Sequence, residues 1–275
     1  MNLLLIGNKG FFSENIKNSL SKEFLIDFYE INKSSEYKEI ISQIKNKLKD
    51  NFFNFLIYLG GETREIELMH KFNVKILVKI ANLCVKKKIS LIYLSSISVY
   101  GIPNKQLITT KSPRIPFSIY GKTKNKADIL IKKKALKIDI FNLLPASIKF
   151  ESKNNFYEKL KNKFKNPLIR NLFYFICPGG QFSFCTHEDI SKEIIKAINY
   201  SGTKKNKNYY EKIISQGIKI KDIFHESNKY MPLYIIPNIK LSLLKKLFFF
   251  LSSKYLLRII FLFTTINYSD KNDEF

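Results

Sequence analysis

Two hydrophobic patterns alternate along the first 145 residues of this 275-residue chain. Short, mostly apolar runs, which are typical of buried strands, occupy residues 2–6, 24–29, 55–59, 91–94 and 138–143. Between them, apolar side chains recur every three or four positions, as on one face of a helix, over residues 13–20, 37–48, 66–85 and 120–136. Strands that alternate with helices of these lengths predict a parallel sheet with helices on both faces, the doubly wound α/β architecture.

The alternation weakens after Pro145. A polar, Lys-rich stretch follows over residues 151–165, and a Pro-Gly-Gly turn stands at 178–180. A helical pattern over 189–198 and an apolar run over 209–215 then continue the alternation of helices and strands. We therefore predict one domain over residues 1–150 and a smaller C-terminal lobe over 151–275, with segments near 181–200 and 208–217 that return to the first domain.

The chain is strongly basic, with 47 Lys and Arg against 23 Asp and Glu. Its 45% hydrophobic and 25% charged residues are nevertheless an ordinary globular composition. None of the basic motifs that recognise nucleic acid occurs, so no nucleic-acid partner is predicted. Solvation of Lys-rich helix surfaces such as 86–88 and 132–134 accounts for much of the charge, and the remainder suits diphosphate ligands or an anionic membrane surface.

Cysteine and histidine are too few and too scattered for a disulfide framework or a metal centre. The three Cys and three His show neither a C-x-x-C pair nor the spacing of zinc ligands, so we predict no metal and a reducing, cytoplasmic location.

Residues 2–6 start directly as an apolar strand without the features of a signal peptide. The Leu- and Phe-rich stretch 241–266 carries Lys245, Lys246, Lys254 and Arg258, which excludes a spanning helix. It is predicted to dock against the lobe, with peripheral membrane contact as the alternative.

A glycine-rich turn joins the first predicted strand to the first helix. It reads Gly7-Asn-Lys-Gly10-Phe-Phe-Ser13, and such a turn lets the backbone approach a diphosphate while the N-terminus of the helix offers free N–H donors. Ser13 stands where a third glycine is usual and still permits close packing. Residues 1–150 are thus predicted to be a dinucleotide-binding Rossmann domain.

Two sets of residues bear on the choice of dinucleotide. Glu30 ends the second predicted strand, 20 residues past Gly10, where a carboxylate can accept hydrogen bonds from the adenosine ribose of NAD. Lys9 and Lys33 can instead hold the 2′-phosphate of NADP. The sequence therefore predicts NAD or NADP and leaves the choice open.

Three polar residues are predicted to form the reactive centre. Tyr120 and Lys124 lie one helical turn apart, and Ser96 follows the strand over 91–94. The Tyr/Lys spacing also occurs at Tyr29/Lys33 and elsewhere, so the position of Ser96 is what distinguishes this pair. We expect the Lys cation to lower the pKa of the Tyr phenol toward neutrality and the Ser hydroxyl to orient a substrate oxygen.

Taken in order, these motifs resemble the extended short-chain dehydrogenases/reductases, and more narrowly the NAD-dependent epimerase/dehydratase family that acts on nucleotide sugars. The resemblance rests on Gly7-x-x-Gly10-Phe11-Phe12, Leu59-Gly60-Gly61, Tyr93-Leu-Ser-Ser96-Ile-Ser-Val-Tyr100-Gly101, Tyr120-Gly-Lys-Thr-Lys124 and Leu144-Pro145-Ala146-Ser147. It implies that Tyr120 is the acid/base, that Lys124 binds the nicotinamide ribose, and that Ser96 holds the reacting sugar oxygen. The cofactor residues that it implies are Gly7, Gly10, Phe11, Phe12, Glu30, Leu59, Gly60, Gly61, Asn73, Lys124 and Pro145.

The resemblance implies an enzyme that acts at C4 of a nucleotide-linked sugar, either an epimerase or a 4-ketosugar reductase like the dTDP-4-dehydrorhamnose reductases, in the biosynthesis of nucleotide sugars or surface polysaccharides. Whether such a chain forms a homodimer is left open. Three departures point to a different alternative: Ser13 in the glycine turn, Leu144 where the family has Arg, and a C-terminus shorter than in relatives. These departures are compatible with a dinucleotide-binding sensor that has lost catalysis.

Overall fold

The structure is a computed structural model, and it describes residues 1–101, 107–149, 156–169, 181–201, 208–219, 222–223, 226 and 267–268. The Leu- and Phe-rich stretch 241–266 and the Pro-Gly-Gly turn at 178–180 lie outside these residues. No helix in the described ranges combines the length and apolar character that crossing a membrane requires.

A parallel sheet of six strands forms the centre of the molecule, with the order β2-β1-β3-β4-β6-β9. The strands are β1 (Asn2–Asn8), β2 (Leu25–Ile31), β3 (Phe55–Tyr58), β4 (Ser90–Leu94), β6 (Ile140–Pro145) and β9 (Tyr209–Ile214). β3 and β6 are buried along their whole length, which explains why they read as continuous apolar runs. The predicted doubly wound fold is confirmed.

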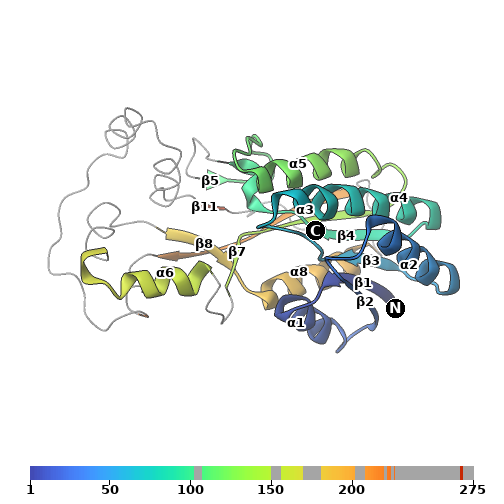
Figure 1. Cartoon of the computed structure of the whole chain (residues 1–275), viewed down its shortest axis with the longest axis horizontal. Helices are drawn as coiled ribbons and strands as arrows, with labels where there is room; N and C mark the ends of the chain where they lie inside the picture. Colours follow the sequence, from blue (N-terminus) through green and yellow to red (C-terminus); the bar gives the residue numbers. More distant parts are fainter. Residues whose placement is uncertain are drawn as a thin grey trace.

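Helices cover both faces of this sheet (Figure 1). On one face, α1 (Phe11–Leu20) packs against α8 (His187–Tyr200) through residues such as Ile16 and Ile194. On the other face lie α2 (Tyr37–Asp50), α4 (Leu77–Lys87) and α5 (Ile119–Lys132), which bury Ile44, Ile80 and Ile131. Alternate residues of β1 point into the two cores, as the pleat of a strand requires.

The helix predicted over residues 66–85 is continuous but changes its winding. It begins as α3 (Ile66–His70), widens to a π-helix over Lys71–Ile76, and continues as α4. A π-helical segment inserts one extra residue into a helix and is frequent at functional sites. Here it carries Asn73, which is fully buried.

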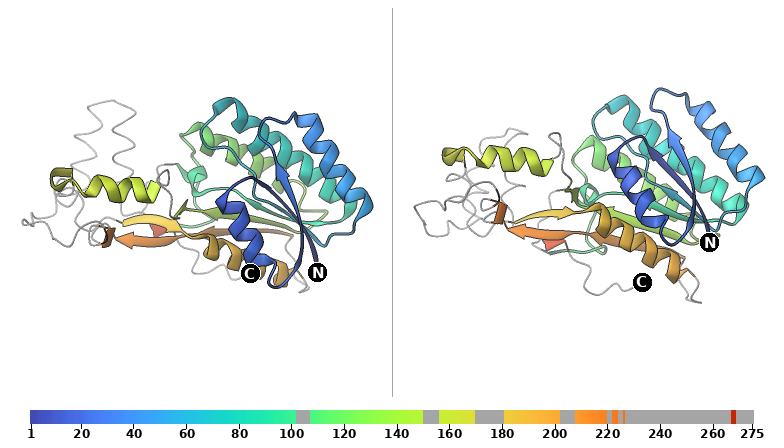
Figure 2. Two further views of the ribbon diagram at one scale, coloured as in Figure 1. Left: turned by 60° about the horizontal axis from the view of Figure 1, so that its bottom comes forward. Right: turned by 90° about the horizontal axis from the view of Figure 1, so that it is seen from below.

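A smaller sheet stands beside the Rossmann domain. It consists of β7 (Ser147–Ile148), β8 (Gln181–Cys185) and β10 (Gln216–Lys219), and α6 (Phe156–Phe164) packs on it through Tyr157, Leu160 and Phe164. Both views in Figure 2 show this sheet extending away from the main sheet, with α6 alongside. A two-residue pairing joins β5 (Leu107–Ile108) to β11 (Asn267–Tyr268).

Candidate active site

Most of the predicted cofactor and catalytic residues lie at one edge of the main sheet. Because the six strands are parallel, their carboxyl ends share that edge, where ligands of doubly wound folds bind. The residues in or directly after the ends of strands are Gly7, Gly10, Glu30, Leu59, Gly60, Gly61, Ser96 and Pro145. Phe11 and Phe12 begin α1 at the same edge.

The glycine turn has the shape that a diphosphate needs. A Cβ on Gly7 would lie 2.5 Å from the Ser13 hydroxyl oxygen, so the missing side chain lets Ser13 pack directly against β1. Gly10 adopts a φ of 142°, and the space around its absent Cβ is open. It also stands at the N-cap of α1, so no side chain caps the first turn of that helix. These features fit the diphosphate of a dinucleotide.

Asn73 braces the loop that follows β3. Its side-chain Oδ1 accepts a hydrogen bond of 2.9 Å from the backbone N–H of Glu62, and its Nδ2 donates to the Glu62 carbonyl at 2.9 Å and to the Thr123 hydroxyl at 3.0 Å. A buried amide needs such partners. Asn73 therefore ties the loop of β3 to α5, the helix that carries Tyr120 and Lys124.

Glu62 is a buried carboxylate that the sequence does not single out. Its side chain is 2% exposed and accepts hydrogen bonds from the backbone N–H groups of Thr63, Arg64 and Glu65 and from the Lys33 ammonium. Burial alone raises the pKa of this carboxyl, but the hydrogen bonds outweigh burial and bring the pKa down to about 2. The charged form of Glu62 therefore stabilises the folded loop.

Replacing Glu62 by Gln should make the folded state less stable at neutral pH and leave it unaffected in strong acid. The wild-type carboxyl titrates near 4.5 when unfolded and near 2 when folded, so its stabilisation is complete above pH 4.5 and is lost as the pH falls toward 2. Because the Lys33 partner is half-exposed and screened, we expect a loss on the order of 2 kcal/mol. Urea unfolding of both proteins across this pH range measures the difference, and a gap that stays constant with pH would contradict the role given to the charge.

Ser96, Tyr120 and Lys124 come together where the carboxyl end of β4 meets the first turns of α5. The Lys124 ammonium lies 5.8 Å from the centre of the Tyr120 ring and donates to the Leu94 carbonyl at 2.8 Å. Tyr120 is half-buried and hydrogen-bonded to the Ser96 side chain. The three residues therefore lie in one cluster.

Two glycines allow this approach. A Cβ on Gly121 would come within 2.5 Å of the Ser98 carbonyl oxygen, so α5 can press its first turn against the 3₁₀ turn Ile97–Tyr100 only because residue 121 is glycine. A Cβ on Gly61 would lie 3.3 Å from both Asn73 Oδ1 and Lys124 Nζ. The Ser118 hydroxyl caps α5 by accepting from the Gly121 N–H at 3.0 Å.

The ionisation of the cluster differs from the expectation. Burial raises the pKa of Tyr120 to about 12, against the lowering effect of its hydrogen bond with Ser96. Burial also lowers the pKa of Lys124 to about 8, against the opposing charge of Asp128. The predicted lowering of the Tyr120 pKa by Lys124 is therefore wrong for the structure as it stands, because desolvation dominates both groups. At neutral pH the Tyr120 phenol keeps its proton.

A buried ionic network lies behind the cluster, and sequence reasoning missed it. Arg114 donates to Asp128 at 2.7 Å and to Glu211 at 2.6 Å, and the Ser95 hydroxyl donates to the same Asp128 oxygen at 2.7 Å. Asp128 stands one turn beyond Lys124 on the buried face of α5. Its i, i+4 spacing from Lys124 is a signal that could have revealed it.

The residues predicted to select between NAD and NADP lie in different surroundings. Glu30 is exposed at the end of β2 and pairs in register with Gly7 of the turn. Lys33, which was considered for a 2′-phosphate, forms an ion pair with Glu62. Lys9 is exposed within the glycine turn.

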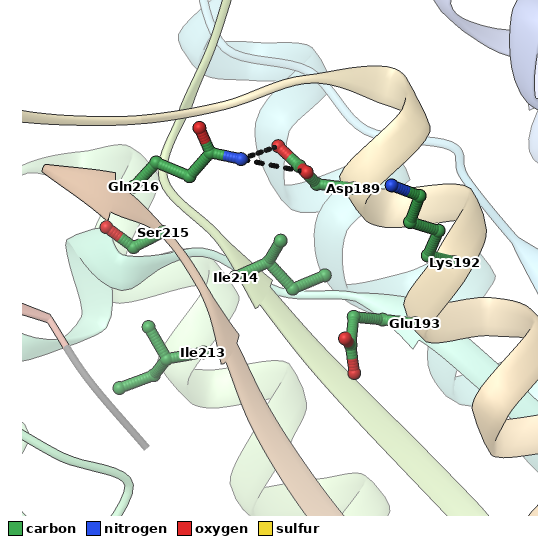
Figure 3. Close-up of a pocket in the computed structure, with 7 residues that line it drawn as sticks. All are labelled: Asp189, Lys192, Glu193, Ile213, Ile214, Ser215 and Gln216. Carbon is green, nitrogen blue, oxygen red and sulfur yellow. Dashed lines mark hydrogen bonds between the residues drawn. The ribbon is translucent and has the colours of Figure 1, made fainter. Parts of the chain in front are cut away.

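In the part of the chain that the structure describes, two hollows near the carboxyl edge stand out, and Ser96, Tyr120 and Lys124 line neither of them. One of about 200 Å³ sits between α8 and the end of β9, where Gln216 donates to both carboxylate oxygens of Asp189 (Figure 3). The other, of about 490 Å³, is lined by Phe11 of the glycine turn, by α6 residues including Tyr157 and Lys161, and by the start of α8. This second hollow lies between the start of α1 and α6, the helix that packs on the smaller sheet. Among the described residues, no group of His, Cys, Asp and Glu could hold a metal ion.

Comparison with known proteins gives a family and a fold. The sequence model of the RmlD substrate binding domain family matches residues 1–167. No curated protein sequence matches the chain.

Solved structures share the architecture at low sequence identity. UDP-glucose 4-epimerase from Thermotoga maritima, solved with UDP-glucose, is 14% identical with a TM-score of 0.64, and the match covers 87% of each chain. dTDP-4-dehydrorhamnose reductase from Bacillus anthracis, solved with NADP, is 16% identical with a TM-score of 0.64, over 88% of this chain and 85% of that one. MoeE5, solved with UDP-glucose and NAD, is 13% identical with a TM-score of 0.61, over 82% and 81%.

Proposed function

Because the chain belongs to the RmlD substrate binding domain family, we propose that it is an NAD(P)-dependent 4-ketosugar reductase that acts on a nucleotide-linked sugar. The family and the shared fold make it an enzyme of the extended short-chain dehydrogenase type. The observation that carries the proposal is the cluster of Ser96, Tyr120 and Lys124 at the carboxyl edge, beside a glycine turn that fits a diphosphate.

The protonated phenol of Tyr120 suits the reductive direction. When bound, the nicotinamide supplies the hydride. Tyr120 donates its proton to the carbonyl oxygen at C4, because burial keeps that proton in place at neutral pH. Ser96 hydrogen-bonds the same sugar oxygen and orients it.

Lys124 has two roles in this proposal. Its ammonium binds the nicotinamide ribose, and it favours the phenolate that Tyr120 becomes after giving up its proton. Its hydrogen bond to the Leu94 carbonyl holds it at the end of β4. Asn73 and Glu62 keep the neighbouring loop in position.

An epimerase at C4 is the second candidate, because the fold is equally similar to that of a UDP-glucose 4-epimerase. The same residues serve both reactions. A reductase consumes one NAD(P)H for each sugar, whereas an epimerase interconverts two sugars with no net change in the cofactor.

The test is to purify the protein, identify any retained cofactor, and follow nucleotide-linked hexoses and 4-ketosugars by NMR together with the absorbance of the reduced cofactor. Reduction of a 4-ketosugar with matching loss of NAD(P)H supports the reductase, and interconversion without that loss supports the epimerase. Dinucleotide binding with no turnover of either class would instead favour the sensor alternative.

Glu30→Gln should weaken the binding of NADH and shift the selectivity toward NADPH. The carboxylate at the end of β2 is placed to accept hydrogen bonds from the ribose hydroxyls and to repel a 2′-phosphate, while Lys33 is held by Glu62. We expect NADH affinity to fall by about tenfold, the typical value of one charged hydrogen bond. Titration calorimetry with both cofactors measures this, with Glu23→Gln as the control because Glu23 is an exposed Glu just before β2, at the opposite end of that strand. Unchanged selectivity in Glu30→Gln would remove Glu30 from the cofactor site.

A further inference from the structure

The edge of the sheet opposite the active site is both basic and apolar. In a doubly wound domain the amino ends of the strands and the C-terminal ends of the helices meet at this edge. The start of β2 is tied to Met1, the start of β1 to Phe52 and Asn54, and the start of β4 to Asn54 and Asp139. In Figure 1 this edge lies at the end of the molecule marked N, away from α6 and β8.

Three large apolar side chains stand out from this edge into solvent. Leu25 is 71% exposed, Phe52 is 74% exposed and Leu136 is 89% exposed. Each belongs to the start of a strand or to the loop before one, so all three project from the same end of the fold. Phe52 also shares a hollow of about 300 Å³ with Lys49 and Lys87.

Lysines surround these apolar side chains. Within the described part of the chain, eight exposed lysines lie at this end: Lys22, Lys49, Lys86, Lys87, Lys88, Lys132, Lys133 and Lys137. The carboxylates found there are Glu23, Asp50 and Asp139, and Asp139 already accepts a hydrogen bond from Ser201. We call the three apolar residues and eight lysines together the basal edge.

We infer that the basal edge docks on an anionic lipid bilayer. Lysines are attracted to acidic headgroups, and Leu and Phe side chains insert at the boundary between headgroups and acyl chains. A nucleic acid would attract the lysines but offer nothing to Leu25 and Leu136. A second copy of the chain would bring like charges together.

Docking in this way leaves the active site free. The glycine turn after β1 and the start of α5 lie at the carboxyl edge, the opposite end of the strands, so a bound molecule directs that edge away from the bilayer. A charged, water-soluble substrate can then enter while the protein stays at the surface. The inference does not depend on the reaction catalysed.

Sedimentation of the full chain with vesicles tests the inference. We expect binding to vesicles of phosphatidylcholine with phosphatidylglycerol, little binding to phosphatidylcholine alone, and weakening with added salt. Lys86→Gln, Lys87→Gln and Lys133→Gln together should lower the partition coefficient at least tenfold, since each lysine near the surface contributes about fivefold. Phe52→Ser with Leu136→Ser should also lower it, without changing the unfolding midpoint, because both side chains are exposed.

The matched control is Lys38→Gln, Lys75→Gln and Lys192→Gln, which removes the same charge from exposed sites elsewhere. It should retain binding. Equal losses in the two triple variants would overturn the inference, since overall charge would then explain them. Tighter binding to a short DNA duplex than to the vesicles, with no effect of the Phe52 and Leu136 changes, would identify a nucleic-acid surface instead.

Discussion

Tyr120→Phe should lower turnover by about 10²- to 10⁴-fold and leave cofactor affinity unchanged. The change removes one hydroxyl and keeps the ring that Lys124 faces. If Tyr120 transfers the proton at C4, the lost rate is that of general acid catalysis. In the same proposal the glycine turn and the loops after β2 and β3 hold the dinucleotide, so the substitution should not weaken its binding. Single-turnover rates and calorimetry of the same preparation separate the two effects.

Tyr29→Phe is the matched control for this substitution. Tyr29 and Lys33 share the spacing of Tyr120 and Lys124. However, Tyr29 lies on the edge strand β2, and its hydroxyl donates a hydrogen bond of 2.6 Å to the side chain of Gln43 in α2. We expect no loss of turnover. Equal rates in Tyr120→Phe and the wild type would refute the assignment of Tyr120 as the acid.

The pH dependence of turnover should distinguish the two directions of proton transfer. Burial places the pKa of Tyr120 near 12 and that of Lys124 near 8. Reduction needs the protonated phenol and therefore tolerates neutral pH, whereas oxidation needs the phenolate and gains rate as the pH rises. Initial rates of both directions, measured against pH, test this: the oxidation rate should rise as the pH approaches the pKa of Tyr120, and the reduction rate should not.

The parallel sheet could be predicted from the sequence because strands that are buried on both faces appear as continuous apolar runs. β3 and β6 are apolar throughout, and the helices between strands repeat their apolar residues with the period of a helix. The glycine turn and the Ser, Tyr and Lys of the cluster could also be placed, since a parallel sheet brings the carboxyl ends of its strands to one edge.

The polar contacts between distant residues could not be predicted. Arg114 lies in a loop without periodicity, and its partner Glu211 is 97 residues away. Spacing also does not reveal the π-helical winding around Asn73 or the hydrogen bonds of Asn73 with Glu62 and Thr123. The pKa of Tyr120 also differs from the expectation. A motif shows which ionisable groups are present, but the extent of their burial in the fold determines their pKa values.

Arg114→Met should destabilise the protein by about 3–5 kcal/mol, the usual cost of removing one member of a buried ion pair. Arg114 is the cation between Asp128, whose side chain is 2% exposed, and Glu211, at 16%. Burial already raises the pKa of Asp128, and Arg114 opposes that shift. Without the guanidinium, two nearby carboxylates share a poorly solvated site.

The pH dependence of unfolding identifies the cause of that loss. In Arg114→Met the pKa of Asp128 should rise further, so that acid protonates this carboxyl in the folded protein. The difference in unfolding free energy between the variant and the wild type should therefore narrow as the pH falls. Arg64→Met, at an exposed position, is the control and should cost little. Adding Asp128→Asn and Glu211→Gln to Arg114→Met should recover part of the stability, because the unpaired charges are then gone. A deficit that is independent of pH and not rescued by these neutral partners would mean that Arg114 acts by packing against Tyr100, over whose ring its guanidinium lies at 5.8 Å.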